Sequence, residues 1–599
     1  MIKQALKFLP FPLILAIIPF LLPGGRLGSY YLTLMILSVS YAVAALGLTV
    51  LLGYSGQVSL AQAAFFGIGS YVFAILAVKY HQYYWEAFIL SLVVTVAFGF
   101  ILGVISLRLA SHYLALVTIG FQIIVELVLN NWSSFTGGAD GISNIPRPVL
   151  FGFDFVSDHA FYWLSLGFLV LASYIVYRVR HSRVGSALLA LREDEIAASA
   201  AGISVFHAKT LAFTISAGLG ALGGILYASG SLYISPNVYS FNQSVSFFAM
   251  VLVGGQESII GTTLGAALIT FLPEVLRFLH AYYIAVYGLL VVIVILFMPE
   301  GLYGMLLRIL DALLGLVWKR GPAGTVVPVA TLPEHRKRRP QASNELVLQV
   351  KGLHKHFGGV KAVNGVDFTI CKGDIAVLIG PNGSGKTTVL NVLSGIYSAT
   401  KGEILYKGAN IANRSPNRIN RLGISRTFQN IRLFPELTAL ENVVIGYFPK
   451  GKVGLAGALF SRPRGYQEER LAREQARKTL ELLGFTRFDE KAKNLPYGQQ
   501  RIVEIARAIV CEPELLLLDE PAAGMNREET EALSEILYRI HDLGLTVLLI
   551  EHDMSFVSSV ATRAYVMDFG QKISEGSVQK VLSDPEVIKA YLGDDAAYA

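Results

Sequence analysis

Charged residues are scarce in this chain of 599 residues, since Asp, Glu, Lys and Arg together make up 16% of it. Soluble globular domains usually contain about 25%, so this composition excludes a chain that is soluble throughout. The charges are also unevenly spread, being sparse before about residue 318 and frequent after it. A chain of this length exceeds a single hydrophobic core, and we expect two or more domains.

Cysteine is scarcer still, with Cys371 and Cys511 the only two. They lack metal-ligand spacing, which excludes a disulfide framework and fits a reducing cytosol. The formal net charge is +7, yet no basic patch interleaved with aromatic residues is present. We therefore expect no nucleic-acid partner and assign the positive charge to cytoplasmic loops that lie near anionic membrane lipid.

Apolar runs dominate the first half of the chain. Lys3 and Lys7 precede the run Phe8–Pro23, and no small-x-small cleavage site follows it, so we expect an uncleaved membrane anchor. Runs of about 17–25 apolar residues, long enough to span a bilayer, then recur and give about eight to ten spans. They lie near 9–24, 30–52, 63–79, 86–107, 113–130, 161–178, 208–230, 244–277 (one span or two) and 280–298.

The loops between these runs differ in charge. The run Tyr177–Arg183 carries a cluster of positive residues, which indicates that the loop 178–209 is cytoplasmic. The loop 131–160 carries Asp140, Asp154 and Asp158 against Arg147, and we expect it on the opposite side.

Polar residues interrupt the apolar half at a few positions. Gly53–Leu60 predicts either a broken helix, with Ser55, Gln57 and Ser59 near a translocation path, or close helix packing through small residues. Gln122 and Glu126 share one helical face, where the carboxylate is either functional or paired near the membrane interface. Glu274 and Arg277 are spaced for a local pair.

The segment from Trp318 to Glu345 contains several prolines and the basic run His335–Arg339, and it predicts a flexible tether. It divides the chain into a membrane domain (1–317), a linker (318–345) and a soluble α/β domain (346–599). We assign no chemistry to the linker, although its basic run can contact lipid headgroups.

The soluble half contains a phosphate-binding motif, G-x-x-x-x-G-K-[ST], at Gly380–Thr387. The apolar strand Ile375–Ile379 precedes it and the helix Thr388–Leu393 follows, which is the context that this motif requires. Backbone amides of such a loop bind phosphate oxygens, Lys386 reaches the β- and γ-phosphates, and Thr387 coordinates Mg²⁺. The residues expected to bind ATP here are Gly380, Pro381, Asn382, Gly383, Ser384, Gly385, Lys386, Thr387 and Thr388.

Two further strands end in groups that suit phosphoryl chemistry. Leu515–Asp519 is followed by Glu520, so Asp519 is placed to hold Mg²⁺ and Glu520 to polarise the attacking water. The strand Thr546–Ile550 precedes His552, a candidate sensor of the γ-phosphate. Gln429 lies between two folded segments and is placed to report nucleotide to a docked partner. The cytoplasmic segment 188–202 is amphipathic and rich in alanine, and we favour a short helix that docks on this ATPase over a solvated hairpin.

Together these motifs resemble the ABC transporter ATPase over residues 346–595. The resemblance implies that Phe357 stacks on adenine, that Gln429 also contacts the metal, and that His552 is the switch histidine. Leu495–Gln499 is similar to the family's signature motif, which completes the ATP site of an opposing ATPase, here through Tyr497, Gly498 and Gln499. Pro496 replaces the usual serine, so the hydroxyl contact to the γ-phosphate is missing.

The variants of these motifs are similar to branched-chain amino acid importers, in both the ATPase and the permease. The segments that carry this resemblance include Gly53–Leu60, Thr136–Ile142, Val253–Glu257, Met298–Leu302, Glu520–Asn526, Ile550–Met554 and Asp584–Leu592. It implies a helical membrane permease fused to an α/β P-loop ATPase that hydrolyses ATP with Mg²⁺ at the bacterial cytoplasmic (inner) membrane, with the ATPase domain in the cytoplasm. It also implies a second permease and a second ATPase, or a homodimer, and an extracytoplasmic substrate-binding protein.

Three alternatives stay open at the level of sequence. Related importers carry urea, amides or aromatic acids in place of branched-chain amino acids. An ABC exporter half-transporter also fuses the two domains, although it has fewer spans and longer cytoplasmic extensions. A nucleotide-gated channel is a third possibility, and an intact Lys386, Asp519 and Glu520 argue against it.

Overall fold

The computed structural model divides the chain into two compact units, Met1–Arg192 with Val205–Gly324 and Glu193–Ser204 with Thr325–Ala599. It describes residues 25–107, 111–150, 152–277, 301–317, 345–451 and 463–592, and isolated residues within 15–19, 282–298 and 454–457. The spans predicted over 9–24 and 280–298 lie largely outside the described residues, as does nearly all of the predicted linker.

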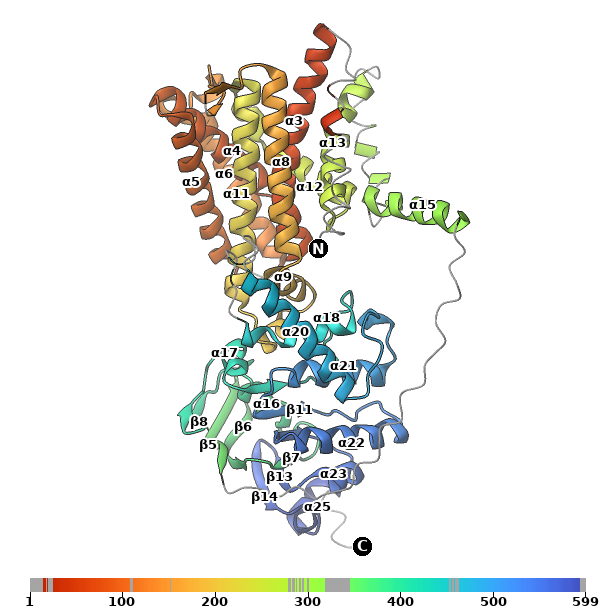
Figure 1. Cartoon of the computed structure of the whole chain (residues 1–599). Helices are drawn as coiled ribbons and strands as arrows, with labels where there is room; N and C mark the ends of the chain where they lie inside the picture. The colour runs from red at the N-terminus through yellow and green to blue at the C-terminus, as the bar shows by residue number, and fades with distance from the viewer. Residues whose placement is uncertain are drawn as a thin grey trace. The chain divides into compact units, whose positions relative to one another are not determined.

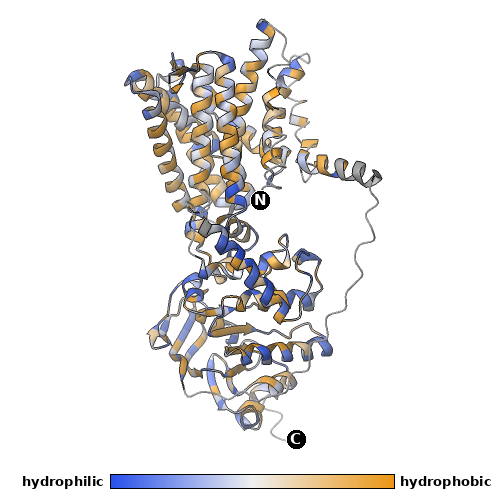
Figure 2. Cartoon of the chain, in the orientation of Figure 1, coloured by the Kyte–Doolittle hydropathy of each residue, from blue (hydrophilic) through white to orange (hydrophobic). Residues whose placement is uncertain are grey.

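The first unit, which we call the membrane unit, is a bundle of apolar helices (Figures 1 and 2). Six of its described helices are long and apolar enough to cross a membrane. They are α3 (Arg26–Leu48) with the π-helical turn η1 (Thr49–Tyr54), α4 (Gln62–Ala74) with η2 (Ile75–Lys79), α5 (Tyr84–Ser106), α6 (Ser111–Asn131), α8 (Asp158–Arg180) and α11 (Val205–Ser231).

Shorter elements complete the membrane unit. The region predicted over 244–277 forms two helices, α12 (Phe241–Gly254) and α13 (Ile259–Val275), which are shorter than the six. The other elements are α7 (Ser133–Thr136), η3 (Gly138–Asp140), β1 (Ile142–Ser143), β2 (Val149–Leu150), β3 (Phe153–Asp154), α9 (Arg183–Glu193), β4 (Tyr233–Ile234), η4 (Pro236–Tyr239) and α15 (Gly301–Val317).

Helix α11 lies at the centre of this bundle and packs against α3, α4 and α5. Its glycines allow the close approach: a Cβ atom added to Gly224 would lie 2.1 Å from the carbonyl oxygen of Phe66, and one on Gly223 would lie 2.6 Å from that of Ser40. Small residues at such contacts let membrane helices pack by van der Waals forces where no hydrophobic effect drives them together.

The predicted interruption after residue 53 is present, whereas a translocation path near Ser55, Gln57 and Ser59 stays a prediction. Helix α3 continues into η1, and residues Ser55–Ala61 are not helical. Helix α4 then begins at Gln62. The close packing is also real, because a Cβ on Gly53 would lie 1.9 Å from the carbonyl oxygen of Gln256. The Ser55 hydroxyl donates to the carbonyl oxygen of Leu51 and accepts from the Gln57 amide, so these buried side chains find partners within the interruption.

The polar residues of the other helices have structural partners. Gln122 donates to the carbonyl oxygen of Tyr239 at 2.7 Å, and Glu126 accepts the backbone N–H of Phe241 at the start of α12. Of the two interpretations offered for Glu126, these contacts favour the paired, structural one. Glu274 and Arg277 form the predicted local pair at 3.4 Å.

The second unit, which we call the cassette, contains two sheets. The larger has the order β10-β11-β12-β7-β13-β14, in which the first five strands are parallel. These strands are β7 (Ile375–Ile379), β10 (Ile424–Arg426), β11 (Leu515–Asp519), β12 (Thr546–Ile550), β13 (Arg563–Asp568) and the antiparallel β14 (Gln571–Gly576). The smaller sheet is antiparallel, β6-β5-β8-β9, with β5 (Leu346–Phe357), β6 (Val360–Cys371), β8 (Lys401–Tyr406) and β9 (Ala409–Asn410).

Two hydrophobic cores flank the parallel sheet, which explains why β7, β11 and β12 are wholly buried apolar runs. One core lies against the antiparallel sheet and the other against helices. The helices of the cassette are α10 (Glu195–Ala200), α16 (Lys386–Leu393), α17 (Pro416–Arg421), α18 (Ala439–Gly446), α20 (Pro463–Leu482), α21 (Tyr497–Ile509), α22 (Arg527–Asp542), α23 (Met554–Val560), α24 (Val578–Leu582) and α25 (Pro585–Leu592), with short turns η6 (Phe448–Lys450) and η7 (Ala492–Asn494).

The close approach at Gly224 predicts a large difference between two glycine substitutions. Gly224→Ala places its new Cβ on the Phe66 backbone and is expected to cost about 1–3 kcal/mol, whereas Gly167→Ala adds a methyl group with nothing within 4 Å. Thermal unfolding followed by tryptophan fluorescence checks this, because all four tryptophans lie in the first 318 residues. Equal midpoints for the two variants would contradict the packing described.

Candidate functional site

The predicted site residues follow neighbouring parallel strands of the cassette. The loop 380–385 follows β7, Glu520 follows β11, His552 follows β12, and Gln429 follows β10. Because the carboxyl ends of parallel strands meet at one edge of a sheet, the topology gathers these groups at a single edge. The strand, loop and helix predicted around Gly380–Thr387 are confirmed.

The backbone of the phosphate loop requires its glycines. Gly380, Gly383 and Gly385 have positive φ values of 149°, 85° and 98°. A Cβ on Gly385 would also lie 2.3 Å from the carbonyl oxygen of Ala362. Gly385 is the N-cap of α16, so the amide-bearing end of this helix faces the loop, which is the arrangement that binds phosphate.

The Lys386 ammonium is buried beneath this loop. It donates to the carbonyl oxygens of Gly380 and Pro381, both at 2.8 Å. Burial lowers the pKa of Lys386, and the nearby carboxylates of Glu520 and Asp519 oppose that shift. The two carbonyl dipoles therefore stabilise the Lys386 ammonium inside the loop, where an anionic ligand would bind.

Asp519 forms a buried ion pair with Arg426, a residue that sequence reasoning missed. The Arg426 Nη2 atom donates to Asp519 Oδ2 at 2.9 Å, and both side chains are at most 4% exposed. Arg426 also donates to Asn391 on α16 and to Ser394, the C-cap of that helix, which ties the phosphate-loop helix to β10 and β11. Burial raises the pKa of Asp519, and the Arg426 guanidinium opposes that rise.

The second oxygen of Asp519 suits a hard cation. Oδ1 is buried and has no hydrogen-bond partner, and an orphaned carboxylate oxygen of this kind is a ligand that Mg²⁺ prefers. Thr387 lies half-buried in the first turn of α16. No group of three His, Cys, Asp or Glu residues in the described part of the chain has metal-site geometry.

The three predicted catalytic residues lie close together. Gln429 Nε2 donates to Glu520 Oε2 at 2.8 Å, and His552 Nδ1 lies 3.9 Å from the same oxygen. Glu520 adopts a positive φ of 42°, a conformation that costs energy for a residue with a side chain and is common at functional sites. The structure thus brings Gln429, Glu520 and His552 to one carboxylate at the edge of the sheet.

Glu551 supports this arrangement and was also missed. One of its oxygens accepts the backbone N–H of Ala522 at 2.8 Å, and the other accepts that of His552 at 3.1 Å. The side chain therefore links the segment after Glu520 to the segment after β12. Burial raises the pKa of Glu551, while these backbone N–H groups oppose the rise.

The remaining predicted nucleotide contacts lie on other elements. The Phe357 ring is 43% exposed at the end of β5, with its centroid 5.2 Å from that of Tyr397 and 4.7 Å from the Lys355 ammonium. Tyr497, Gly498 and Gln499 begin α21, with Pro496 as its N-cap. A Cβ on Gly498 would lie 2.6 Å from Glu529, so this motif packs against the start of α22.

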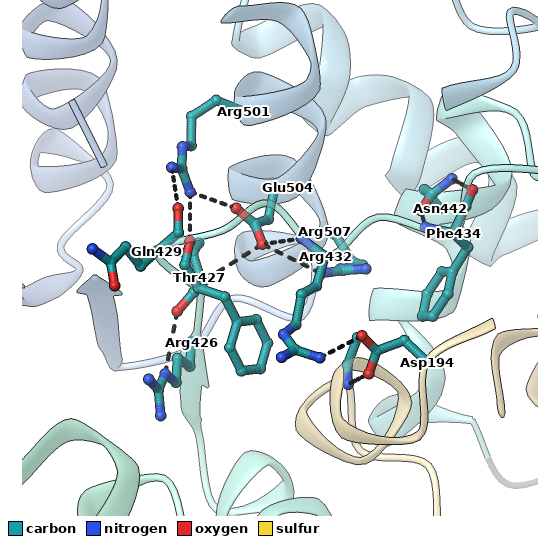
Figure 3. A network of polar contacts seen from close by, with 12 residues as sticks. Asp194, Arg426, Thr427, Gln429, Arg432, Phe434, Asn442, Arg501, Glu504 and Arg507 are labelled. Carbon is teal, nitrogen blue, oxygen red and sulfur yellow. Dashed lines mark hydrogen bonds and ion pairs between the residues drawn. The ribbon is translucent and has the colours of Figure 1, made fainter. Parts of the chain in front are cut away.

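The single helix predicted over 188–202 is wrong in one respect, because it is two helices divided at Asp194. The Asp194 side chain caps α10 by accepting the N–H groups of Ile196 and Ala197. Its other oxygen accepts Arg432 Nη1 at 2.6 Å (Figure 3). Helix α10 belongs to the cassette unit, which favours the docking interpretation over a solvated hairpin.

Known protein families match both halves of the chain. Residues 30–298 match the branched-chain amino acid transport system permease component, 363–523 match the ABC transporter family, and 571–597 match the branched-chain amino acid ATP-binding cassette transporter family. The high-affinity branched-chain amino acid transport ATP-binding protein LivG of Escherichia coli K12 is 41% identical over 250 residues, 41% of this chain and 98% of LivG. The chain belongs to the branched-chain amino acid ABC transporter family.

Other members of this family are similar to the same part of the chain. BraF of Pseudomonas aeruginosa is 42% identical over 41% of this chain and 98% of its own, and a probable LivG of Archaeoglobus fulgidus is 38% identical over 41% and 95%. A solved nucleotide-free ATP-binding cassette from an ABC transporter is 36% identical over 42% of this chain and 100% of its own, with a TM-score of 0.37. This ABC transporter chain is therefore a membrane protein that joins a permease to a nucleotide-binding ATPase, as predicted.

The ion pair of Arg426 predicts a pH-dependent loss of stability when the arginine is removed. Arg426→Met leaves the Asp519 carboxylate buried without its cation, which costs about 3–5 kcal/mol. Losing that cation raises the folded-state pKa of Asp519 further, so folding favours the protonated form. The deficit relative to wild type is therefore expected to shrink as the pH falls through that pKa. Pulse proteolysis of the cassette in urea between pH 8 and pH 5 measures it.

The matched control is Arg421→Met, at an exposed arginine at the end of α17. It is expected to leave the urea midpoint nearly unchanged at every pH. A deficit in Arg426→Met that stays constant across this range would show that Asp519 does not cause it.

Proposed function

We propose that this chain is one half of an importer that uses ATP hydrolysis to move branched-chain or related amino acids across the bacterial cytoplasmic (inner) membrane. In this proposal residues 1–317 form the permease, 318–345 the linker and 346–599 the ATPase, which lies in the cytoplasm. The names of the similar LivG and BraF proteins support the substrate class. The importer needs a second permease and a second ATPase, and an extracytoplasmic binding protein that delivers the amino acid.

One observation carries the coupling between hydrolysis and transport. Gln429 and Arg432 lie in the same loop, where Gln429 contacts Glu520 and Arg432 holds Asp194. Asp194 belongs, in sequence, to the cytoplasmic segment between two membrane helices. A movement of this loop on nucleotide binding therefore acts on the permease segment directly.

In this proposal the residues described above bind different parts of Mg²⁺-ATP. The loop 380–388 would bind the phosphates, Lys386 would neutralise the β- and γ-phosphate charge, and Phe357 would stack on adenine. Asp519 and Thr387 would hold Mg²⁺, with Gln429 beside them. When bound, Mg²⁺ offsets the negative charge that develops on the transferred phosphoryl group.

Hydrolysis itself would depend on Glu520. Its carboxylate accepts a hydrogen bond from Gln429 and lies near His552, so it is placed to orient water and take up its proton. His552, whose side chain is 63% exposed, would contact the γ-phosphate. Tyr497, Gly498 and Gln499 would complete the site of the opposing ATPase, where Pro496 cannot donate the hydrogen bond that a serine would supply.

The decisive test is uptake of radiolabelled leucine, isoleucine and valine into cells that lack this chain. Wild type is expected to restore uptake, and Glu520→Gln is expected to abolish it, because an amide cannot accept the proton of the attacking water. ATP binding should survive in Glu520→Gln, since the phosphate loop is intact.

Glu528→Gln provides the control, because it makes the same chemical change at an exposed residue of α22, away from the contacts of Glu520. It is expected to restore uptake as wild type does. Normal leucine, isoleucine and valine uptake in cells lacking the chain would refute this substrate class and direct the same assay to amides, urea and aromatic acids.

A further inference from the structure

Two charged residues in the middle of α21 are wholly buried. Arg501 and Glu504 are both 0% exposed, and Arg501 Nη1 donates to Glu504 Oε2 at 2.8 Å (Figure 3). Arg507, one turn further along, brings a second guanidinium to 3.8 Å from Glu504 Oε1. A buried carboxylate between two guanidiniums is costly to assemble, and such a pair adds little to stability compared with apolar residues of similar size.

The pair holds the backbone of the segment 428–432. Arg501 donates to the carbonyl oxygens of Phe428, at 2.7 Å, and of Gln429, at 3.0 Å. Glu504 Oε1 accepts the backbone N–H groups of Phe428, at 3.4 Å, and of Arg432, at 3.2 Å. The two side chains thus bind both ends of the segment, through donors and acceptors that no apolar pair can supply.

The segment carries a contact to a different part of the cassette at each end. Gln429 donates to Glu520 at the predicted site of hydrolysis, and Arg432 donates to Asp194, the N-cap of α10. At the other side of the pair, Arg501 Nη2 lies 3.4 Å from the hydroxyl of Tyr497, in the motif that starts α21. Three predicted functional elements therefore share one buried pair.

The Phe428 side chain adds rigidity between these contacts. Its ring lies within cation–π distance of two guanidiniums, with Arg426 at 5.0 Å and Arg432 at 5.3 Å from the ring centroid. Arg426 is the residue paired with Asp519, so the same ring connects the Asp519 ion pair to the arginine that holds Asp194. The segment is thus held by contacts through both its backbone and its Phe428 ring.

We propose that the Arg501–Glu504 pair is a positioning device that fixes the segment 428–432 to α21, so that a change at the nucleotide site is transmitted to α10. Neither residue is among those predicted to bind nucleotide. The inference rests on the proposed function for the nucleotide site, and it adds the route by which that site regulates the permease segment.

The test is hydrogen exchange on the full-length chain in lipid nanodiscs, with and without Mg²⁺-ATP, in peptides that cover 194–202 and 428–434. The double variant R501M/E504L replaces the pair with apolar residues of similar volume, and it is expected to fold and to bind ATP with unchanged affinity. Its ATP-induced change in exchange over 194–202 is expected to fall at least about 5-fold, the lower bound of typical coupling between sites.

Two further variants separate positioning from folding. Glu504→Gln keeps an oxygen that accepts the N–H groups of Phe428 and Arg432, and is expected to retain part of the response. R473M/E469L removes an exposed pair on α20, 3.6 Å apart, and is expected to retain all of it. If R501M/E504L fails to fold, Glu504→Gln alone decides, because a full response there contradicts the role of the charge.

The outcomes also separate this inference from the proposed function. A wild-type chain that binds ATP without a change over 194–202, or a double variant that transmits the change undiminished, overturns the inference and leaves ATP-driven import standing. A wild-type chain that binds no ATP overturns both.

Discussion

The buried ion pair between Arg426 and Asp519 is the interaction on which the geometry of the cassette site depends. A carboxylate at the end of an internal parallel strand cannot remain charged without a partner, and Arg426 supplies one from the neighbouring strand. Because the same guanidinium also binds Asn391 and Ser394, it fixes β10, β11 and the phosphate-loop helix relative to one another. The orphaned oxygen of Asp519 is then presented in a defined direction, which a cation site requires.

Buried polar side chains have different kinds of partner in the two units. In the cassette, buried charges are met by opposite charges, as at Arg501 and Glu504. At the centre of the membrane unit, a buried amide is met by uncharged groups: the Gln62 amide donates to the Ala44 carbonyl at 2.7 Å and accepts from the Ser216 hydroxyl at 2.8 Å. This difference follows from the environment, because a bilayer offers no water to a charge that loses its partner.

Much of the cassette could be predicted from sequence because its chemistry follows short apolar strands. The loop after Ile379 and the carboxylates after Leu518 are local patterns, whereas Arg426 finds Asp519 across 93 positions of sequence. The Arg501–Glu504 pair was missed for a related reason, since charges on an amphipathic helix usually face solvent. The division of 188–202 at Asp194 could have been predicted from the sequence, because Asp is a favoured helix N-cap residue and Glu-Ile-Ala follows it. Glu126 could not be assigned, because its partner is a backbone N–H at Phe241.

The contacts of α10 suggest how ATP hydrolysis could stay coupled to transport when a permease and an ATPase are fused. If residues 318–345 are the linker that we predict, they would set the effective concentration of the two domains, and linker length changes that concentration only gradually. Such a linker does not specify an orientation. Coupling also requires a contact with defined geometry, and within the cassette the ion pair between Asp194 and Arg432 holds the segment Glu193–Ser204, which in sequence lies between α8 and α11. In the coupling that we propose, the covalent fusion would replace a diffusional encounter between subunits, and the ion pair between Asp194 and Arg432 would carry the mechanical signal.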